Sequence, residues 1–161
     1  MEIELSMNKF CDSLIVKLYE RNIIMAAYEK FDDESMKKWY SQYLMPGENV
    51  IVAVAVVYSN AGLFLNSGSF PGYLAITDGD RILCHNRDIK GENDFYFYLM
   101  NAKKIKLKRS IFGNLSVFIV FSNERKKIKL KFKTVKILVP ELRQQNEKNI
   151  NDLETFLKSK A

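Results

Sequence analysis

The sequence predicts an α+β fold, in which a bent antiparallel β barrel of about seven strands is capped by a C-terminal helix and preceded by a two-helix appendage. Three observations predict it. Short stretches rich in β-branched and aromatic residues recur from Glu48 onward, separated by turn residues. Two of these stretches alternate lysine with apolar residues, which is typical of antiparallel strands with one buried face. Apolar residues recur at helical spacing near both ends of the chain.

Two helices are predicted before the barrel. Over 3–30, apolar residues from Leu5 to Leu18 and on to Ile24 or Met25 recur at steps of three or four. The acidic run 32–34 is favoured in a first helical turn, so we expect a second helix from about Asp33 to Leu44, ended by Pro46-Gly47. We expect these helices either to pack on the barrel or to form an interface with a second copy or a partner.

The strands follow in order. They are expected at Val50–Val57, Gly72–Thr77, Arg81–Asn86, Phe95–Met100, Lys104–Ser110, Leu115–Phe121 and Lys127–Lys133. Turns are expected at 78–80, at 88–93, at Gly113-Asn114 and at 123–126. The last helix is expected over about Pro140–Ser159, because proline suits a first turn and apolar residues recur after it.

This order resembles the pleckstrin-homology (PH)-like superfold, especially its bacterial PH and GRAM-like branches. Gly72-x-Leu74-x-Ile76-Thr77, a turn at 78–80 and Arg81-Ile-Leu83 are similar to a hairpin motif of those domains. The run from Ile105 through 113–115 to Ile128 and Phe132, followed by the helix, is also similar. The resemblance covers about 47–158 and divides the chain into an appendage over 1–45 and a PH-like domain over 46–161.

The resemblance implies a non-catalytic binding or scaffolding module, and a protein partner is the first expectation. Family members that bind phosphoinositides carry clustered Lys and Arg on the first two strands and their loop. Here Val50–Thr77 contains no Lys or Arg. Without cations, little would hold a multiply phosphorylated headgroup, so inositol phosphate binding at that place is not expected.

A basic segment is the sharpest feature of the sequence. Residues 101–137 hold twelve Lys or Arg and one Asp or Glu, although the whole chain has a net charge of only +6. If the strand 115–121 lies between its two neighbours, lysines border Phe118 on one outer face. That face is a candidate surface for an acidic partner or an anionic membrane, or else a solvated face that discourages edge pairing. Its residues are Lys104, Lys106, Lys108, Phe118, Lys127, Lys129, Lys131 and Lys133.

A second candidate surface is the apolar loop between the first two strands, which contains Leu63, Phe64, Leu65 and Phe70. It would either contact a partner or a membrane, or fold over its own barrel. Nucleic acid binding is disfavoured, because Phe118 is the only plausible base-stacking residue on the basic face.

No residue pattern predicts catalysis, a metal or a cofactor. The only histidine, His85, follows Cys84 in a strand, so the two side chains point to opposite faces and form no dyad. Asp78, Asp80, Asp88 and Asp94 are expected in turns, where Asp is common. The acidic first residues lack the pattern of a signal peptide, so we expect an intracellular, cytoplasmic protein, with the inner membrane face as the alternative location.

Overall fold

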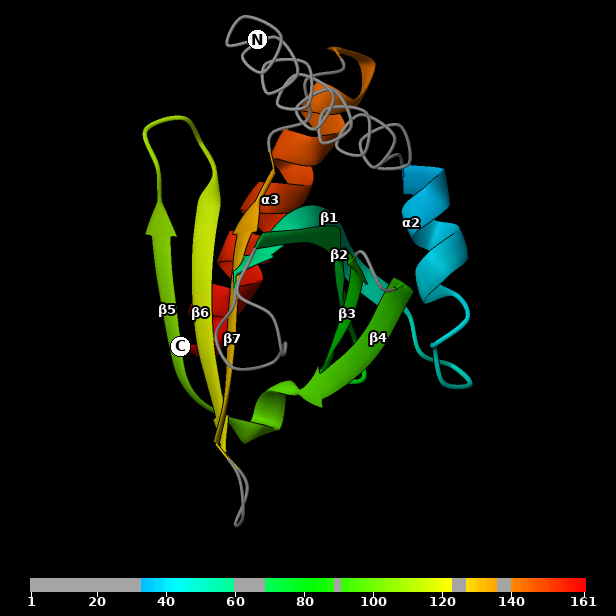
Figure 1. Ribbon diagram of the computed structural model, residues 1–161, viewed down its shortest axis with the longest axis vertical. Coiled ribbons are helices and arrows are strands. Elements are labelled where there is room, and N and C mark those ends of the chain that lie inside the picture. The colour runs from blue at the N-terminus through cyan, green and yellow to red at the C-terminus, as the bar shows by residue number, and fades with distance from the viewer. Residues whose placement is uncertain (1–32, 60–68, 89–90, 123–126, 136–139) are drawn as a thin grey trace, which may run out of the picture. The chain divides into compact units, whose positions relative to one another are not determined.

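Seven antiparallel strands form one sheet with the order β4-β3-β2-β1-β7-β6-β5, and a long helix follows them (Figure 1). This computed structural model describes residues 33–59, 69–88, 91–122, 127–135 and 140–161, with the backbone alone at 69–70, 87–88, 91–93 and 140–142. These residues lie within Phe31–Ala161, one of the two compact units of the chain. The predicted first helix, over 3–30, lies outside the described residues.

The α+β class, the seven antiparallel strands and the C-terminal helix of the prediction are confirmed. The described elements are α2 (Asp33–Tyr40), β1 (Val50–Ser59), β2 (Ser69–Thr77), β3 (Arg81–Asp88), β4 (Gly91–Tyr98), the 3₁₀ helix η1 (Leu99–Asn101), β5 (Ala102–Arg109), β6 (Leu115–Ser122), β7 (Lys127–Thr134) and α3 (Pro140–Lys160).

Several predicted boundaries were wrong, in most cases because backbone pairing extends past the apolar pattern. Strand β2 starts at Ser69, opposite Ser59, instead of at Gly72. The predicted turn over 88–93 is mostly strand, since Asp88 pairs with Gly91 and the ladder continues from there. Conversely, α2 ends at Tyr40, before the predicted Leu44, and a turn follows it.

The sheet bends strongly at β1. This strand pairs with β2 along most of its length but with β7 only over Val56–Tyr58. Figure 1 shows the result, with β1–β4 and β5–β7 as two parts of a curved sheet. Inward side chains of both parts form one core, which includes Val54, Leu74, Ile82, Ile119 and Phe132.

Helix α3 supplies part of that core. Ile150, Leu153 and Leu157 are each at most 3% exposed and pack with the strand residues, as their helical spacing predicts. Ion pairs hold the helix at two further points, Glu154 with Arg109 of β5 and Lys160 with Asp80 of the β2–β3 turn. The apolar stripe of α3 therefore closes the core, while its opposite face stays polar.

Gly72 permits the close approach of β2 to β3. A Cβ atom at this position would lie 1.8 Å from the backbone oxygen of His85, where no side chain fits. The glycine that begins the predicted hairpin motif is thus required by the packing of two backbones.

Candidate binding surface

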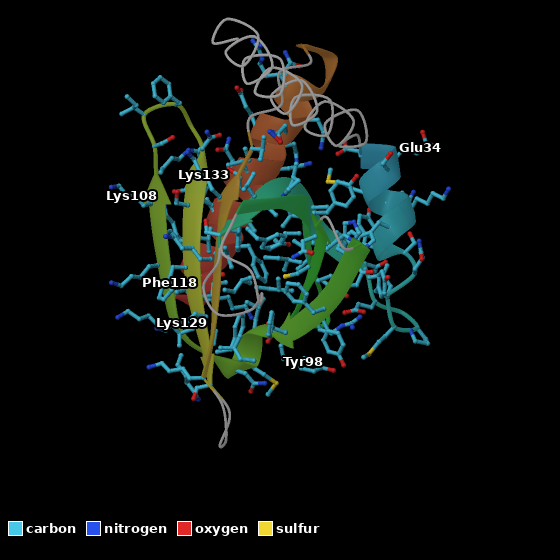
Figure 2. The ribbon with its side chains drawn as sticks, in the orientation of Figure 1. Glu34, Tyr98, Lys108, Phe118, Lys129 and Lys133 are labelled. Atoms are coloured by element: carbon cyan, nitrogen blue, oxygen red, sulfur yellow. The ribbon has the colours of Figure 1, made fainter. Side chains whose placement is uncertain are left out.

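Strands β5, β6 and β7 place the predicted lysines on one outer face in three rows. Across the strands, Lys108, Ser116 and Lys133 form the row nearest the β5–β6 turn. Lys106, Phe118 and Lys131 form the middle row, and Lys104, Val120 and Lys129 form the third. Lys127 lies opposite Ser122 at the far end. We call these seven lysines with Phe118 the lysine face; Figure 2 labels Lys108, Phe118, Lys129 and Lys133 along these strands.

The alternation of lysine with apolar residues along β5 and β7 creates this face. Every second residue points inward, so Ile105, Leu107, Leu130 and similar residues pack on the core while the lysines point to solvent. Strand spacing in sheets is about 4.8 Å, so lysine backbones on β5 and β7 are about 10 Å apart across β6. The face thus concentrates positive charge on a rigid sheet.

An apolar strip runs along β6, between the lysines of β5 and those of β7. Val120 is only 6% exposed and Phe118 is half-buried, although both point outward. Long lysine stems commonly cover apolar surface while their ammonium groups stay in water. The strip therefore exposes little apolar area to solvent, and positive charge is the main property of the face.

The three strands supply no carboxylate of their own to balance that charge. Strands β5, β6 and β7 contain no Asp or Glu. All seven lysines are exposed, and none forms an ion pair with another residue that the structure describes. Ammonium groups of this kind suit an extended surface of anionic groups, because each acts as a point charge with three rotatable donors.

The β5–β6 turn carries two exposed apolar residues that the sequence analysis did not single out. Ile111 is 94% exposed and Phe112 is 73% exposed. The turn is ordered by three hydrogen bonds between Ser110 and the residues Gly113 and Asn114. We call Ile111 and Phe112 the hairpin tip. Their signal in the sequence was an apolar pair between the end of a strand and the Gly-Asn turn.

The second predicted surface is not placed by the structure. Leu63, Phe64 and Leu65 lie outside the described residues. Phe70 belongs to β2, where its backbone pairs with Tyr58, but its side chain is not described. This loop therefore stays a prediction.

Arg81 and Glu48 form a buried ion pair at the β2–β3 turn. The Glu48 carboxylate also accepts hydrogen bonds from the Thr77 hydroxyl and from the backbone N–H of Met45. Arg81 Nη2 donates to the Tyr43 backbone oxygen at 2.8 Å. The hydrogen bond from Arg81 lowers the pKa of Glu48 to about 2. Burial opposes this shift, and the hydrogen bonds from Met45 and Thr77 add to it. Two residues of the predicted motif, Thr77 and Arg81, therefore bind the side chain of Glu48, which lies just before β1.

Helix α2 packs on the outer side of β2–β4. Trp39 Nε1 donates to Asp94 at 2.8 Å, and its ring lies against Tyr73 and His85. Asp94 also accepts from Tyr43 at 2.6 Å and contacts His85 Nδ1 at 2.7 Å. Burial raises the pKa of Asp94, but these hydrogen bonds outweigh it, and the net shift is downward. The second predicted helix thus packs on the sheet.

The prediction that Asp94 lies in a turn was wrong. It lies in β4 opposite His85, and its carboxylate joins α2, β3 and β4. Cys84, by contrast, points into the core. Adjacent residues of a strand point to opposite faces, and its neighbour His85 points outward. Burial raises the pKa of the Cys84 thiol, and the group is a free cysteine. The two side chains therefore lie on opposite faces of β3.

The described residues contain no group of three His, Cys, Asp or Glu that could hold a metal ion. Among them there is also no helix with the length and apolar character needed to cross a membrane. A small hollow lies between the hairpin tip and α3, and both polar and apolar side chains line it. The lining comprises Arg109, Phe112, Gly113, Asn114, Arg143, Asn146, Glu147, Ile150 and Asn151.

No protein-family model matches the chain, and no curated protein matches it. A C-terminal domain of an unknown protein from Leishmania infantum is similar in structure, with 17% identity and a TM-score of 0.44 over 77% of this chain and 92% of that chain. A second similar structure comes from work on SsgB mutations and longitudinal cell division in sporulating Streptomyces coelicolor, with 15% identity and a TM-score of 0.32 over 70% and 85%. Neither likeness assigns a family or a function to this chain.

Proposed function

We propose that this chain is a non-catalytic binding domain that holds an acidic macromolecular surface on its lysine face. One observation carries the proposal: seven exposed lysines lie on β5 and β7, in register across β6, and none of the three strands contains a carboxylate. Like charges this close repel one another, so a face that only needed solubility would gain from interspersed Asp or Glu. A ligand that carries several anionic groups would relieve this repulsion.

We also propose that the domain belongs to the PH-like superfold. The order of seven antiparallel strands and a closing helix supports it, as does the motif around Thr77 and Arg81. In this interpretation the ion pair of Arg81 with Glu48 is the structural reason for the motif. The β2–β3 turn would then have a scaffolding role, and the binding surface would lie elsewhere.

A role without catalysis is favoured by where the reactive groups lie. The Cys84 thiol points into the core, and its raised pKa keeps it protonated at neutral pH. His85 is covered by Trp39 and Tyr73 and contacts Asp94. Neither arrangement presents a nucleophile or a base to a substrate.

Two kinds of ligand carry the required charge. An acidic segment of a protein is the first expectation from the sequence, and an anionic membrane is the alternative. The exposed hairpin tip next to the lysine face favours the membrane, because it adds an apolar element to the basic one.

A variant with Lys127, Lys129, Lys131 and Lys133 changed to Gln tests the lysine face. Binding would be measured against poly-glutamate, and against vesicles of phosphatidylcholine alone or mixed with phosphatidylserine, at low and physiological salt. Each basic residue near an anionic bilayer contributes on the order of 1 kcal/mol, so we expect at least about tenfold weaker binding. The matched control changes Lys37, Lys38, Lys148 and Lys158 to Gln, which removes the same charge from elsewhere. Equal losses in both variants would contradict the proposal.

A further inference from the structure

We infer that the acidic surface is an anionic membrane, and that Ile111 and Phe112 at the hairpin tip insert into it while the nearest lysines bind the headgroups. This inference rests on the proposed function of the lysine face and deepens it. It assigns a membrane-inserting role to the β5–β6 turn, a different segment from the β1–β2 loop for which the sequence suggested a membrane contact.

The exposure of the tip is the first step. Ile111 and Phe112 are adjacent, and most of each side chain faces solvent. Exposure of both side chains to water is unfavourable, because it leaves their apolar surface hydrated. Large apolar side chains gathered at the end of a projecting turn are typical of an interaction site.

The stiffness of the turn is the second step. Ser110 N donates to Asn114 O at 2.9 Å, and Gly113 N donates to Ser110 O at 3.0 Å. Gly113 has a φ of 85°, which glycine adopts without the penalty that other residues would incur. The tip is therefore held out at the end of two long paired strands, so little ordering entropy would be lost when it inserts.

The charge around the tip is the third step. Lys108 and Lys133 form the row nearest the turn, and Arg143 of α3 is exposed beside the hollow that Phe112 lines. Of the described residues that line this hollow, Glu147 is the one carboxylate, so positive charge predominates among them. Basic residues that flank an inserted apolar pair can reach headgroup phosphates and anionic headgroups while the pair enters the apolar region.

The three rows predict how the domain is oriented. Residues two apart on a strand are about 6.8 Å apart, so the row of Lys104 and Lys129 lies about 14 Å farther from the tip than that of Lys108 and Lys133. The Debye length is about 8 Å at physiological salt. If the tip enters the membrane end-on, the near row contributes more than the far row. If the sheet lies flat on the membrane, the two rows contribute equally.

The test compares three variants in flotation on phosphatidylcholine–phosphatidylserine vesicles at physiological salt. The tip variant carries Ile111→Ser and Phe112→Ser, the near-row variant Lys108→Gln and Lys133→Gln, and the far-row variant Lys104→Gln and Lys129→Gln. We expect about tenfold weaker binding for the tip variant, and a larger loss for the near row than for the far row. Thermal unfolding shows that each variant is folded, since all six positions are exposed.

Insertion itself is measured by fluorescence in vesicles whose acyl chains are brominated. The emission of Phe112→Trp should be quenched, whereas that of the wild type should not, because its single tryptophan, Trp39, is buried between α2 and the sheet. Flotation that persists without this quenching and without loss in the tip variant would overturn the inference but leave the lysine face in place. If the wild type does not float with the vesicles but binds poly-glutamate through its lysines, the membrane inference is overturned. An acidic protein partner would then remain as the ligand of the lysine face. If the wild type neither floats with the vesicles nor binds poly-glutamate, the proposed function is overturned as well.

Discussion

Glu48 and Arg81 form an ion pair in which both side chains are almost wholly buried, at 5% and 3% exposure. Glu48 lies just before β1, and Arg81 opens β3. The pair therefore joins the entry of the sheet to its first hairpin, and it is completed by Thr77, Met45 and Tyr43. The Arg81 guanidinium also lies over the Tyr96 ring at 5.1 Å.

Removing one partner of this pair should destabilise the domain strongly. Glu48→Ala leaves the guanidinium buried without its carboxylate, which typically costs about 3–5 kcal/mol. Urea unfolding would measure the loss. The matched control is Asp152→Ala, which breaks the exposed pair with Lys148 and should cost less than about 1 kcal/mol. Similar losses in the two variants would show that burial of the Glu48–Arg81 pair is unimportant.

The same carboxylate predicts an acid-sensitive fold. The pKa of Glu48 falls from 4.5 to about 2 on folding. A group with a depressed folded-state pKa stabilises the protein above its unfolded pKa, and this stability is lost as the pH falls toward the folded pKa. The shift corresponds to about 3 kcal/mol, lost between about pH 5 and pH 2.

Urea unfolding across this pH range would measure that loss in the wild type and in Glu48→Gln. The variant should be less stable at neutral pH and should show a flatter dependence on pH. Some slope would remain, because the pKa values of Asp94 and Glu154 are also lowered on folding. Parallel pH profiles for the two proteins would assign the acid sensitivity to other groups.

The order of the strands along the chain and the shared face of the lysines could be predicted, because both depend on local pattern. Alternation of period two decides which residues share a face, and short turns keep neighbouring strands antiparallel. Lys106, Phe118 and Lys131 therefore lie side by side, as the alternation predicts, although they span 26 positions in sequence. Strand ends were less predictable, because backbone pairing continues through polar residues such as Asn93.

The roles of Glu48, Asp94 and the hairpin tip could not be predicted from local pattern. Glu48 resembles any acidic residue before a strand, and its partner Arg81 is 33 positions away. Asp94 was assigned to a turn, so its contact with Trp39, 55 positions away, had no basis in the sequence. Ile111 and Phe112 form an apolar pair before the Gly-Asn turn, but their exposure emerges only from the structure.

Asp94 should control whether α2 stays on the sheet. Asp94→Ala removes the acceptor of Trp39, Tyr43 and His85 and should cost about 1–3 kcal/mol. Because Trp39 is the only tryptophan, its emission should shift to the red as α2 detaches. Tyr43→Phe removes one of these contacts from an exposed residue and should shift the emission little. An unchanged emission in Asp94→Ala would mean that apolar contacts alone hold the helix.

Gly72 and Gly113 should differ sharply in their tolerance of alanine. At Gly72 the added Cβ would lie 1.8 Å from the His85 backbone oxygen, so β2 and β3 must separate, and we expect a loss of about 3 kcal/mol or more. At Gly113 the space is open, and only the φ of 85° opposes alanine, at a cost of about 1 kcal/mol. Urea unfolding of both variants compares the two effects, since the chemical change is the same. A Gly72→Ala protein as stable as the Gly113→Ala protein would contradict the close backbone approach that places His85 against α2.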